Sequence, residues 1–368
     1  MLIGAPPQIT DDALPVWGAD CDDDLVCRAV TDEAHDVRSF HFATDRPCRF
    51  RFEPGQFLTL ELPPDKIGNG QTVFRCYTIS SPPTRPETLS ITTKRVRGGP
   101  VSNWLHDHVR PGVRLRATGP SGTFVLPRTH DARLLFLSGG SGITPLMSML
   151  RTLFDRAWDR DVIFVHSARS PGDIIFRDEL ALMARRLPRL RVAHVPESRD
   201  GEPGWPGLVG RLDARMLGLL APDLLEREIF CCGPAPYMAG VRALLDQSGF
   251  DRSRYHEESF SFEALPDAVL EEVTAAEAVA EATFSVIFAK SGKTVACPPG
   301  TTVLAAAKAA GLRLPSSCTR GVCGTCKSRM LSGRVTMQHG GGIRPREIDQ
   351  GMVLICCSRP LEDLVIDR

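Results

Sequence analysis

The feature that most constrains this chain is the spacing of four cysteines near its C-terminus. Cys318, Cys323 and Cys326 form the pattern C-x4-C-x2-C, and Cys356 follows thirty residues later. This is the ligand spacing of a plant-type [2Fe–2S] cluster, which is held by four thiolates. A chain with this pattern has to build a small domain in which one short loop wraps three thiolates around a compact cluster.

Two glycines inside the cysteine loop, Gly321 and Gly324, support this interpretation. Glycine adopts positive φ angles at little cost, so both positions allow the tight turns that such a loop needs. They also leave backbone N–H groups free to point at the sulfur atoms. We expect Cys356 to come from a separate strand, where adjacent residues face opposite sides, so that Cys357 points away from the cluster.

A zinc site is the alternative interpretation of these cysteines. Zinc prefers paired C-x2-C knuckles in a tetrahedral array. This region has one such knuckle, an additional cysteine upstream and no histidine at ligand spacing. The spacing therefore favours the iron–sulfur cluster. Most of the other cysteines are expected to pack as small hydrophobic residues.

The composition excludes several classes of protein. The 368 residues carry a formal net charge of zero, which gives no reason to expect nucleic acid or an anionic membrane as a partner. No apolar run approaches the roughly 20 residues that span a bilayer, and the N-terminus lacks the pattern of a signal peptide. Twelve cysteines without an export signal indicate reduced, metal-binding cysteine and a cytoplasmic protein.

The pattern of apolar residues changes twice along the chain. Short alternating segments separated by Pro, Gly and Asp predict an antiparallel β-barrel in the first third. Apolar strands that alternate with helices then predict a parallel α/β sheet. A stretch rich in Ala, Glu and Pro predicts a tether, and a hairpin and a helix before the cysteine loop predict a β-grasp domain. The expected boundaries are an extension at 1–23, the barrel at 24–127, the α/β domain at 128–262, a linker at 263–282 and the cluster domain at 283–368.

Three further motifs lie in the first two predicted domains. Residues 75–80 read R-C-Y-T-I-S at the end of a barrel strand. Residues 139–145 read G-G-S-G-I-T-P between an apolar strand and an amphipathic helix, which is the context of a phosphate-binding loop. Residues 232–234 read C-G-P after a later strand of the same sheet.

Together with the cysteine loop, these motifs resemble the ferredoxin–NADP reductase-like flavoenzymes that carry a plant-type ferredoxin domain at the C-terminus. The order of motifs matches over roughly residues 25–368. Within that superfamily the chain resembles the reductase components of Rieske-type oxygenases, such as the glycine betaine and stachydrine demethylases, and the reductase of hybrid-cluster protein. The resemblance implies the cofactors FAD, a [2Fe–2S] cluster and NADH or NADPH; FAD rather than FMN depends on it alone.

The resemblance assigns flavin contacts to the first motif. It implies that Arg75 pairs with the flavin diphosphate, Tyr77 packs on the isoalloxazine ring and Thr78 bonds its N5 edge. A guanidinium group matches phosphate oxygens in bidentate geometry, which agrees with the first role. Residues 98–105 resemble the family's second phosphate loop, at a helix start that attracts anions. The expected flavin-side residues are Arg75, Tyr77, Thr78, Ser80, Lys94, Gly99, Val101, Ser102 and Phe260.

The resemblance assigns the nicotinamide cofactor to the other two motifs. It implies that the glycine loop holds the pyrophosphate and that Thr144 and Cys232 flank the nicotinamide ring, as catalytic residues with a positional role. Without the other motifs, Cys232 would be interpreted as a buried cysteine before a turn. The expected nucleotide-binding residues are Gly140, Gly142, Thr144, Pro145, Gly233 and Pro234.

The sequence thus predicts an enzyme that passes electrons from NAD(P)H through FAD and the cluster to an iron protein, with the terminal oxygenase of a methylated-amine demethylase favoured as partner. Two alternatives stay open: a reductase of hybrid-cluster protein, and a redox-sensing protein without obligatory turnover. Ser167, Arg169 and Arg177 are candidates for a 2′-phosphate contact. The sequence does not decide between NADH and NADPH, and we favour NADH.

Overall fold

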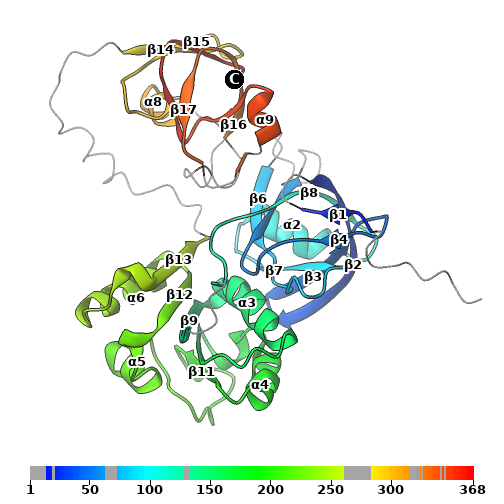
Figure 1. The fold of residues 1–368 in the computed structure, drawn as a ribbon, viewed down its shortest axis with the longest axis vertical. Coiled ribbons are helices and arrows are strands. Elements are labelled where there is room, and N and C mark those ends of the chain that lie inside the picture. The colour runs from blue at the N-terminus through cyan, green and yellow to red at the C-terminus, as the bar shows by residue number, and fades with distance from the viewer. Residues whose placement is uncertain are drawn as a thin grey trace, which may run out of the picture. The chain divides into compact units, whose positions relative to one another are not determined.

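The computed structural model describes residues 14–18, 21–62, 73–127, 132–260, 283–312, 314, 321, 324, 326–339, 342–343 and 345–368 (Figure 1). The chain forms two compact units. The first contains residues 1–72 and 77–260, and the second contains residues 73–76 and 261–368. Among the described residues, no helix is both long enough and apolar enough to cross a membrane.

The N-terminal part of the first unit is the predicted antiparallel barrel. Its six-stranded sheet has the order β6-β5-β8-β2-β3-β7, and a bridge between Ile79 and Ile91 links the chain after β6 to β7. A short parallel pair, β1 (Val16–Trp17) and β4 (Arg49–Phe50), adds to it. The larger strands are β2 (Asp22–Ala34), β3 (Val37–Ala43), β5 (Phe57–Leu62), β6 (Val73–Thr78), β7 (Leu89–Lys94) and β8 (Arg114–Ser121), and helix α2 spans Pro100–His108.

The rest of the first unit is the predicted parallel α/β domain. Its strands have the order β11-β10-β9-β12-β13, and each pair of neighbouring strands is parallel. The strands are β9 (Leu134–Gly139), β10 (Val162–Ala168), β11 (Leu190–Pro196), β12 (Glu228–Gly233) and β13 (Tyr255–Ser259). The helices are α3 (Ile143–Asp155), α4 (Arg177–Arg186), α5 (Ala214–Leu220) and α6 (Ala235–Gln247).

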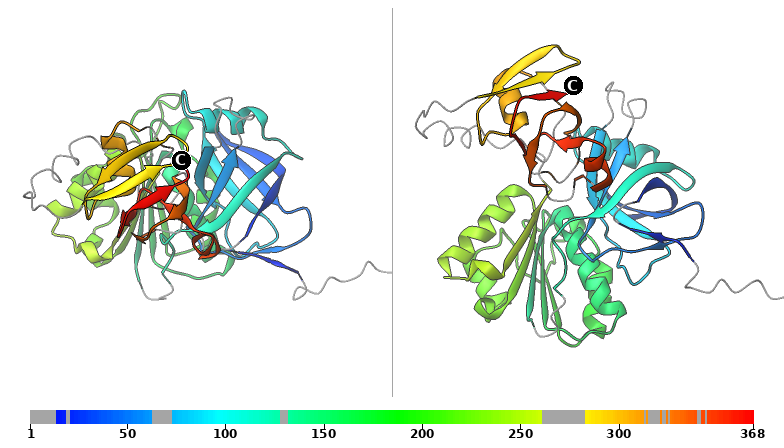
Figure 2. Two further views of the ribbon diagram at one scale, coloured as in Figure 1. Left: turned by 90° about the horizontal axis from the view of Figure 1, so that it is seen from above. Right: turned by 45° about the horizontal axis from the view of Figure 1, so that its top comes forward.

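Helices cover both faces of this sheet, as the views in Figure 2 show. Alternate residues of each strand belong to two separate cores, because successive side chains on a strand face opposite ways. Phe136, Phe164 and Phe230 pack with α3 and α4, whereas Leu137 and Val165 pack with α5 and α6. Burial on both faces explains why these strands are continuous apolar runs in the sequence.

Arg151 on α3 joins the nucleotide domain to the barrel. Its Nη1 donates to the carbonyl oxygen of Ser80 at 2.7 Å, directly after strand β6. Its other guanidinium atoms form a fork on Glu179 of α4 at 2.8 and 2.5 Å, and the group lies 4.5 Å from the ring centre of Phe176. Ser148, one turn earlier, donates to the carbonyl of Ser81 at 2.8 Å. Helix α3 is therefore bonded to the end of the flavin-motif strand.

The second unit contains a five-stranded sheet of order β15-β14-β20-β16-β18. Helix α8 (Val303–Ala309) packs on it through Val303, Leu304 and Ala307. The helix starts at Thr302, whose side chain accepts from the backbone of Ala305, and Gly311 follows its end with a φ of +76°. The other elements are β14 (Phe284–Phe288), β15 (Lys293–Cys297), β16 (Lys327–Ser332), β17 (Val335–Met337), α9 (Pro345–Asp349), β18 (Met352–Leu354), β19 (Ser358–Pro360) and β20 (Leu364–Ile366).

Replacing Arg151 should test how strongly this junction stabilises the first unit. We expect Arg151→Met to lower the free energy of unfolding by about 2 to 4 kcal/mol, because a mostly buried ion pair loses one partner. The side chain of Arg151 is 11% exposed. Arg85 provides the control, since it crosses the same junction to Asp155 but is 56% exposed. Arg85→Met should lower the free energy of unfolding by less than about 1 kcal/mol. Urea unfolding measures both variants, and equal decreases would contradict the stabilising role assigned to Arg151.

Candidate functional site

The end of strand β6 carries the flavin motif. Arg75 and Tyr77 are half-buried and, two residues apart on the strand, share one face. Thr78 is 4% exposed, and its hydroxyl has no hydrogen-bond partner within the described part of the chain. A buried hydroxyl without a partner costs free energy unless a ligand or water satisfies it. Thr78 therefore fits the hydrogen bond to a flavin edge that the sequence predicted.

Ser80, also expected to contact the cofactor, lies inside the barrel. It is 0% exposed, and its hydroxyl bonds to those of Thr92 at 2.8 Å and Ser90 at 3.2 Å. Ser39 extends this buried chain of hydroxyls to Thr92 at 2.8 Å. The geometry thus gives Ser80 a structural role, in which it fixes the chain after β6 through its side chain while its carbonyl accepts from Arg151.

The start of helix α2 forms the predicted second phosphate loop. Gly99 is its N-cap residue and has no side chain to cap the first amides, and the first turn contains no acidic residue. Ser102 accepts from the backbone N–H of Val96 at 3.1 Å and donates to the carbonyl of Gly99 at 3.3 Å. Val101 is buried in the barrel. The helix start is therefore shaped by Ser102 and Val101, and its own amides are the groups suited to a phosphate.

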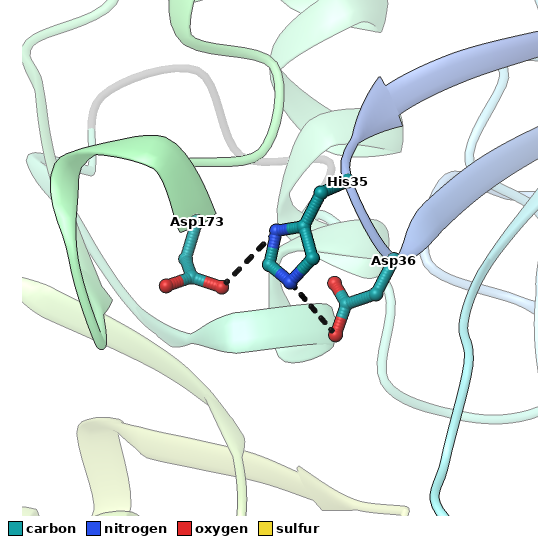
Figure 3. Close-up of side chains that lie close together, drawn as sticks. All are labelled: His35, Asp36 and Asp173. Atoms are coloured by element: carbon teal, nitrogen blue, oxygen red, sulfur yellow. Dashed lines mark ion pairs between the residues drawn. The ribbon is translucent and has the colours of Figure 1, made fainter. Parts of the chain in front are cut away.

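Lys94, the last residue of β7, belongs to an ion-pair network. Its Nζ lies 3.1 Å from a carboxylate oxygen of Asp36 and 3.9 Å from one of Asp173. Figure 3 shows His35 between the same two carboxylates, 3.8 Å from each. The Lys94 ammonium already supplies positive charge there, so the arrangement is an ion-pair network rather than a cation site. Lys94 binds Asp173 across the junction of the two domains, which disfavours the predicted cofactor contact.

The glycine loop and the C-G-P segment lie against each other, as the sequence predicted for one nucleotide site. Strands β9 and β12 are neighbours, with Ser138 opposite Cys232. The loop after β9, η2 (Gly140–Gly142), packs so closely that a Cβ on Gly142 would lie 2.3 Å from the carbonyl oxygen of Cys232 and 2.5 Å from the nitrogen of Gly233. Only glycine permits this approach of two backbones.

Helix α3 begins at Ile143, so Thr144 and Pro145 lie in its first turn. The Thr144 hydroxyl donates to the carbonyl of Ser141 at 3.1 Å, and Thr144 is 2% exposed. This bond closes the loop against the helix and leaves the loop amides as the groups available to an anion. The position suits the pyrophosphate and gives Thr144 a part in shaping the loop.

Cys232 is fully buried at the end of β12, on the face that also carries Phe230. Burial raises the pKa of its thiol well above the usual value, so the group is neutral at physiological pH. A neutral thiol does not act as a nucleophile, which agrees with a positional role. Phe260 packs against the same core. Pro234 is exposed, and Tyr237 lies close enough to touch a Cβ placed on Gly233 or Gly139.

Sequence reasoning missed a pair of neighbouring histidines beside this site, of which His166 is fully buried and His194 partly buried. His166 on β10 is opposite His194 on β11, and its Nδ1 is 2.8 Å from the hydroxyl of Ser138. Burial lowers the pKa of His166 to about 3 and that of His194 to about 4, so both rings are neutral. The sequence did contain a signal for them: each histidine lies in the second half of a predicted parallel strand. Ligands bind at the carboxyl ends of such strands.

The structure describes part of the predicted metal site. Cys326 and Cys356 are 3% and 5% exposed, whereas Cys318 and Cys323 lie outside the described residues. Gly321 and Gly324 have φ angles of +69° and +73°, which confirms the predicted turns. The amide of Gly321 donates to the sulfur of Cys356 at 3.3 Å, a contact suited to a thiolate ligand.

The neighbourhood of Cys356 corrects one expectation. Cys356 and Cys357 lie in a turn between β18 and β19, not on a strand, so alternation of faces does not separate them. Cys357 packs beneath the loop instead: its sulfur would lie 2.7 Å from a Cβ on Gly321 and donates to the carbonyl of Leu354 at 3.5 Å. Contacts with the thiols of Cys326 and Cys357, and the Gly321 amide, lower the pKa of Cys356 to about 3.

Three family models match the chain in the predicted order. An oxidoreductase FAD-binding domain matches residues 25–126, an oxidoreductase NAD-binding domain matches residues 136–243, and a 2Fe-2S iron-sulfur cluster binding domain matches residues 286–361. The cofactors FAD, NAD and the [2Fe–2S] cluster are therefore confirmed at the level of domains. The iron–sulfur model excludes the zinc alternative.

Curated relatives extend over almost the whole chain. The glycine betaine monooxygenase reductase subunit of Pseudomonas aeruginosa is 49% identical over 93% of this chain and 94% of its own length. The stachydrine N-demethylase reductase subunit of Rhizobium meliloti is 43% identical over 93% of this chain and 96% of its own length. The chain belongs to this family of monooxygenase reductase components.

Solved structures agree with the family. Phthalate dioxygenase reductase has a TM-score of 0.56 at 24% identity, over 94% of this chain and 98% of its own, which shows the shared fold. The ferredoxin reductase of carbazole 1,9a-dioxygenase has a TM-score of 0.55 at 28% identity, over 65% of this chain and 69% of its own. As a member of this family with FAD-binding, NAD-binding and iron–sulfur domains, the protein is an electron-transfer reductase that uses NAD(P)H. The individual site residues and domain boundaries stay predictions.

Serine substitutions at the paired cysteines should separate ligand from packing residue. We expect Cys356→Ser to abolish the visible absorption of the cluster, because a thiolate ligand is lost. Cys357→Ser should retain the cluster, since its sulfur packs under Gly321 and bonds to Leu354. Iron content and visible spectra of the purified proteins measure both. Cluster loss in Cys357→Ser with an intact cluster in Cys356→Ser would reverse the assignment.

Proposed function

We propose that this reductase delivers electrons to a Rieske-type terminal oxygenase that demethylates a methylated amine of the glycine betaine or stachydrine class. The observation that carries the proposal is the 49% identity to a glycine betaine monooxygenase reductase subunit along almost the full length of both chains. The 43% identity to a stachydrine N-demethylase reductase subunit supports the same class. A steroid-oxygenase reductase component of Mycobacterium tuberculosis is less similar, at 36%.

The residues of this chain would assist electron transfer mainly by holding the cofactors in a fixed geometry. FAD, when bound, would supply the chemistry that accepts a hydride as two electrons and releases them one at a time to the cluster. Hydride transfer between two cofactors needs close and fixed geometry more than an acid or a base. The neutral thiol of Cys232, the closed loop at Thr144 and the rigid junction at Arg151 meet this need.

Reconstitution with candidate oxygenases tests the proposal. With dioxygen as the oxidant, the full-length protein, NADH and a purified methylated-amine oxygenase should together release formaldehyde from the amine, and omission of the reductase should abolish this release. The control acceptor is hybrid-cluster protein, which represents the alternative reductase function. Turnover with hybrid-cluster protein and none with any methylated-amine oxygenase would overturn the proposal. If NADH is not consumed with either partner although ferricyanide is reduced normally, the physiological acceptor is another class of oxygenase and the proposal fails.

We also propose that NADH is the electron donor. The candidate cations for a 2′-phosphate follow strand β10, and Arg177 is already held there by Glu202 at 2.8 and 3.2 Å. The guanidinium group of Arg177 also lies 5.0 Å from the ring centre of Trp205. Asp173 accepts a hydrogen bond from the hydroxyl of Ser170 at 2.7 Å and also belongs to the ion-pair network of Lys94. A 2′-phosphate would compete with Glu202 for Arg177, whereas a 2′-hydroxyl would not.

Removing the charge of Glu202 should therefore admit NADPH. We expect Glu202→Gln to raise kcat/KM for NADPH about five- to tenfold, because a charge-assisted pair with Arg177 is released, while kcat/KM for NADH changes little. Glu226→Gln is the matched control, since Glu226 pairs with Arg133, which directly precedes the amino end of the central strand β9. Steady-state ferricyanide reduction with both nucleotides measures the ratio. Equal NADPH kinetics in both variants would exclude Glu202 as the selecting residue.

A further inference from the structure

Charge is distributed unevenly along this neutral chain. Residues 283–368 contain twelve lysines and arginines against five aspartates and glutamates. Residues 261–282 contain six acidic residues and no basic one, and residues 1–260 are nearly balanced, with 32 basic and 33 acidic residues. The zero net charge therefore conceals a strongly basic cluster domain.

Most acidic groups of this domain are already engaged. Glu347 binds the ammonium of Lys327 at 2.7 Å, and Asp363 accepts from the backbone of Ser285 at 2.7 Å. The carboxylates of Asp367 and Glu362 each pair with a cation, Lys290 and Arg334 respectively, at 3.2 Å. With twelve lysines and arginines against five carboxylates, the domain keeps an excess of seven positive charges, and Asp349 on α9 is its remaining acidic residue.

Several cations of this domain lie where the chain leaves the cysteine loop. Lys327 directly follows Cys326 and begins β16, whose next exposed cation is Arg329. Arg368 donates to the carbonyl of Lys327 and, at 3.0 Å, to the hydroxyl of Ser328.

Arg346 is exposed on α9, the helix that carries the Lys327 partner Glu347 and contacts β18. We call Lys327, Arg329, Arg346 and Arg368 the basic edge.

The basic edge adjoins the cluster loop by direct contacts. The amide of Lys327 donates to the carbonyl of Gly324 at 2.9 Å, and the amide of Gly342, three residues before α9, donates to the carbonyl of Gly321 at 2.9 Å. Strand β18 is the outer strand of the sheet on this side, and β15 is the outer strand on the other. The positive charge is therefore close to the groups through which electrons leave the domain.

We propose that the basic edge is the docking surface for an electron acceptor with an acidic surface around its own redox centre. The proposal deepens the proposed function, since it describes the surface that the terminal oxygenase would present. Complementary charge steers encounter and orients partners, with effects that decrease as salt increases. Because the whole chain is neutral, its net charge cannot produce such a salt effect, and only a local surface can.

Two small acceptors of opposite charge test the sign of this surface in the intact holoprotein. Reduction of acidic cytochrome b5 should slow by about tenfold between low ionic strength and 0.5 M salt, because screening removes attraction. Reduction of basic cytochrome c should become faster over the same range, because screening removes repulsion. A cytochrome c rate that falls with salt, or a cytochrome b5 rate that does not, would overturn the proposal.

Charge reversal locates the surface. Arg346→Glu should reduce the cytochrome b5 rate about three- to tenfold at low ionic strength and match the parent protein at high salt. Lys293→Glu is the matched control, because Lys293 is exposed on β15 at the opposite side of the sheet. Flavin content, cluster absorption and ferricyanide reduction should be unchanged in both variants. If the two substitutions reduce the cytochrome b5 rate equally, the basic edge is not the docking surface.

The outcomes separate this inference from the proposed function. If the cytochrome assays behave as expected but no methylated-amine oxygenase accepts electrons, the basic edge stands and the choice of oxygenase fails. If a methylated-amine oxygenase turns over at a rate independent of salt and of Arg346→Glu, the function stands and the basic edge fails.

Discussion

The structure of the first unit depends on the hydrogen bond from Arg151 to the carbonyl of Ser80. This bond ties the helix after the nucleotide loop to the strand end that carries the flavin motif. Glu179 and Phe176 hold the guanidinium group from the other side, so its direction is fixed. Reactions between two bound cofactors are sensitive to displacements of about 1 Å. A junction built from a buried, multiply bonded arginine meets that requirement better than an exposed ion pair does.

A second constraint is the close approach of two backbones in the nucleotide domain. The loop before α3 lies on the carbonyl of Cys232, and a side chain at Gly142 would collide with it. This contact exists because β9 and β12 are neighbours in the sheet although about ninety residues separate them in the sequence. It places the loop amides, which suit a phosphate, next to the neutral thiol. The order of the strands therefore decides which groups lie together at this site.

The second unit combines a reducing cluster with a basic exterior. Its twelve lysines and arginines outnumber its five carboxylates, and exposed cations such as Arg329 and Arg346 lie near the cysteine loop. Cluster chemistry alone does not choose among acceptors, because plant-type clusters have low potentials near about −400 mV and can reduce many iron centres. Selection then depends on surface charge, which acts on the rate of encounter.

The sequence by itself determined the order of domains, the cysteine loop and the two nucleotide-binding motifs, because local spacing and glycine torsions dictate these features. The positive φ angles of Gly321 and Gly324 follow from that local requirement. Tertiary structure decided what depends on contacts between distant segments. It placed the hydroxyl of Ser80 inside the barrel and Lys94 in an ion-pair network, and it put Cys357 in a turn. Such outcomes depend on burial and on neighbours far away in the chain, which no local pattern encodes.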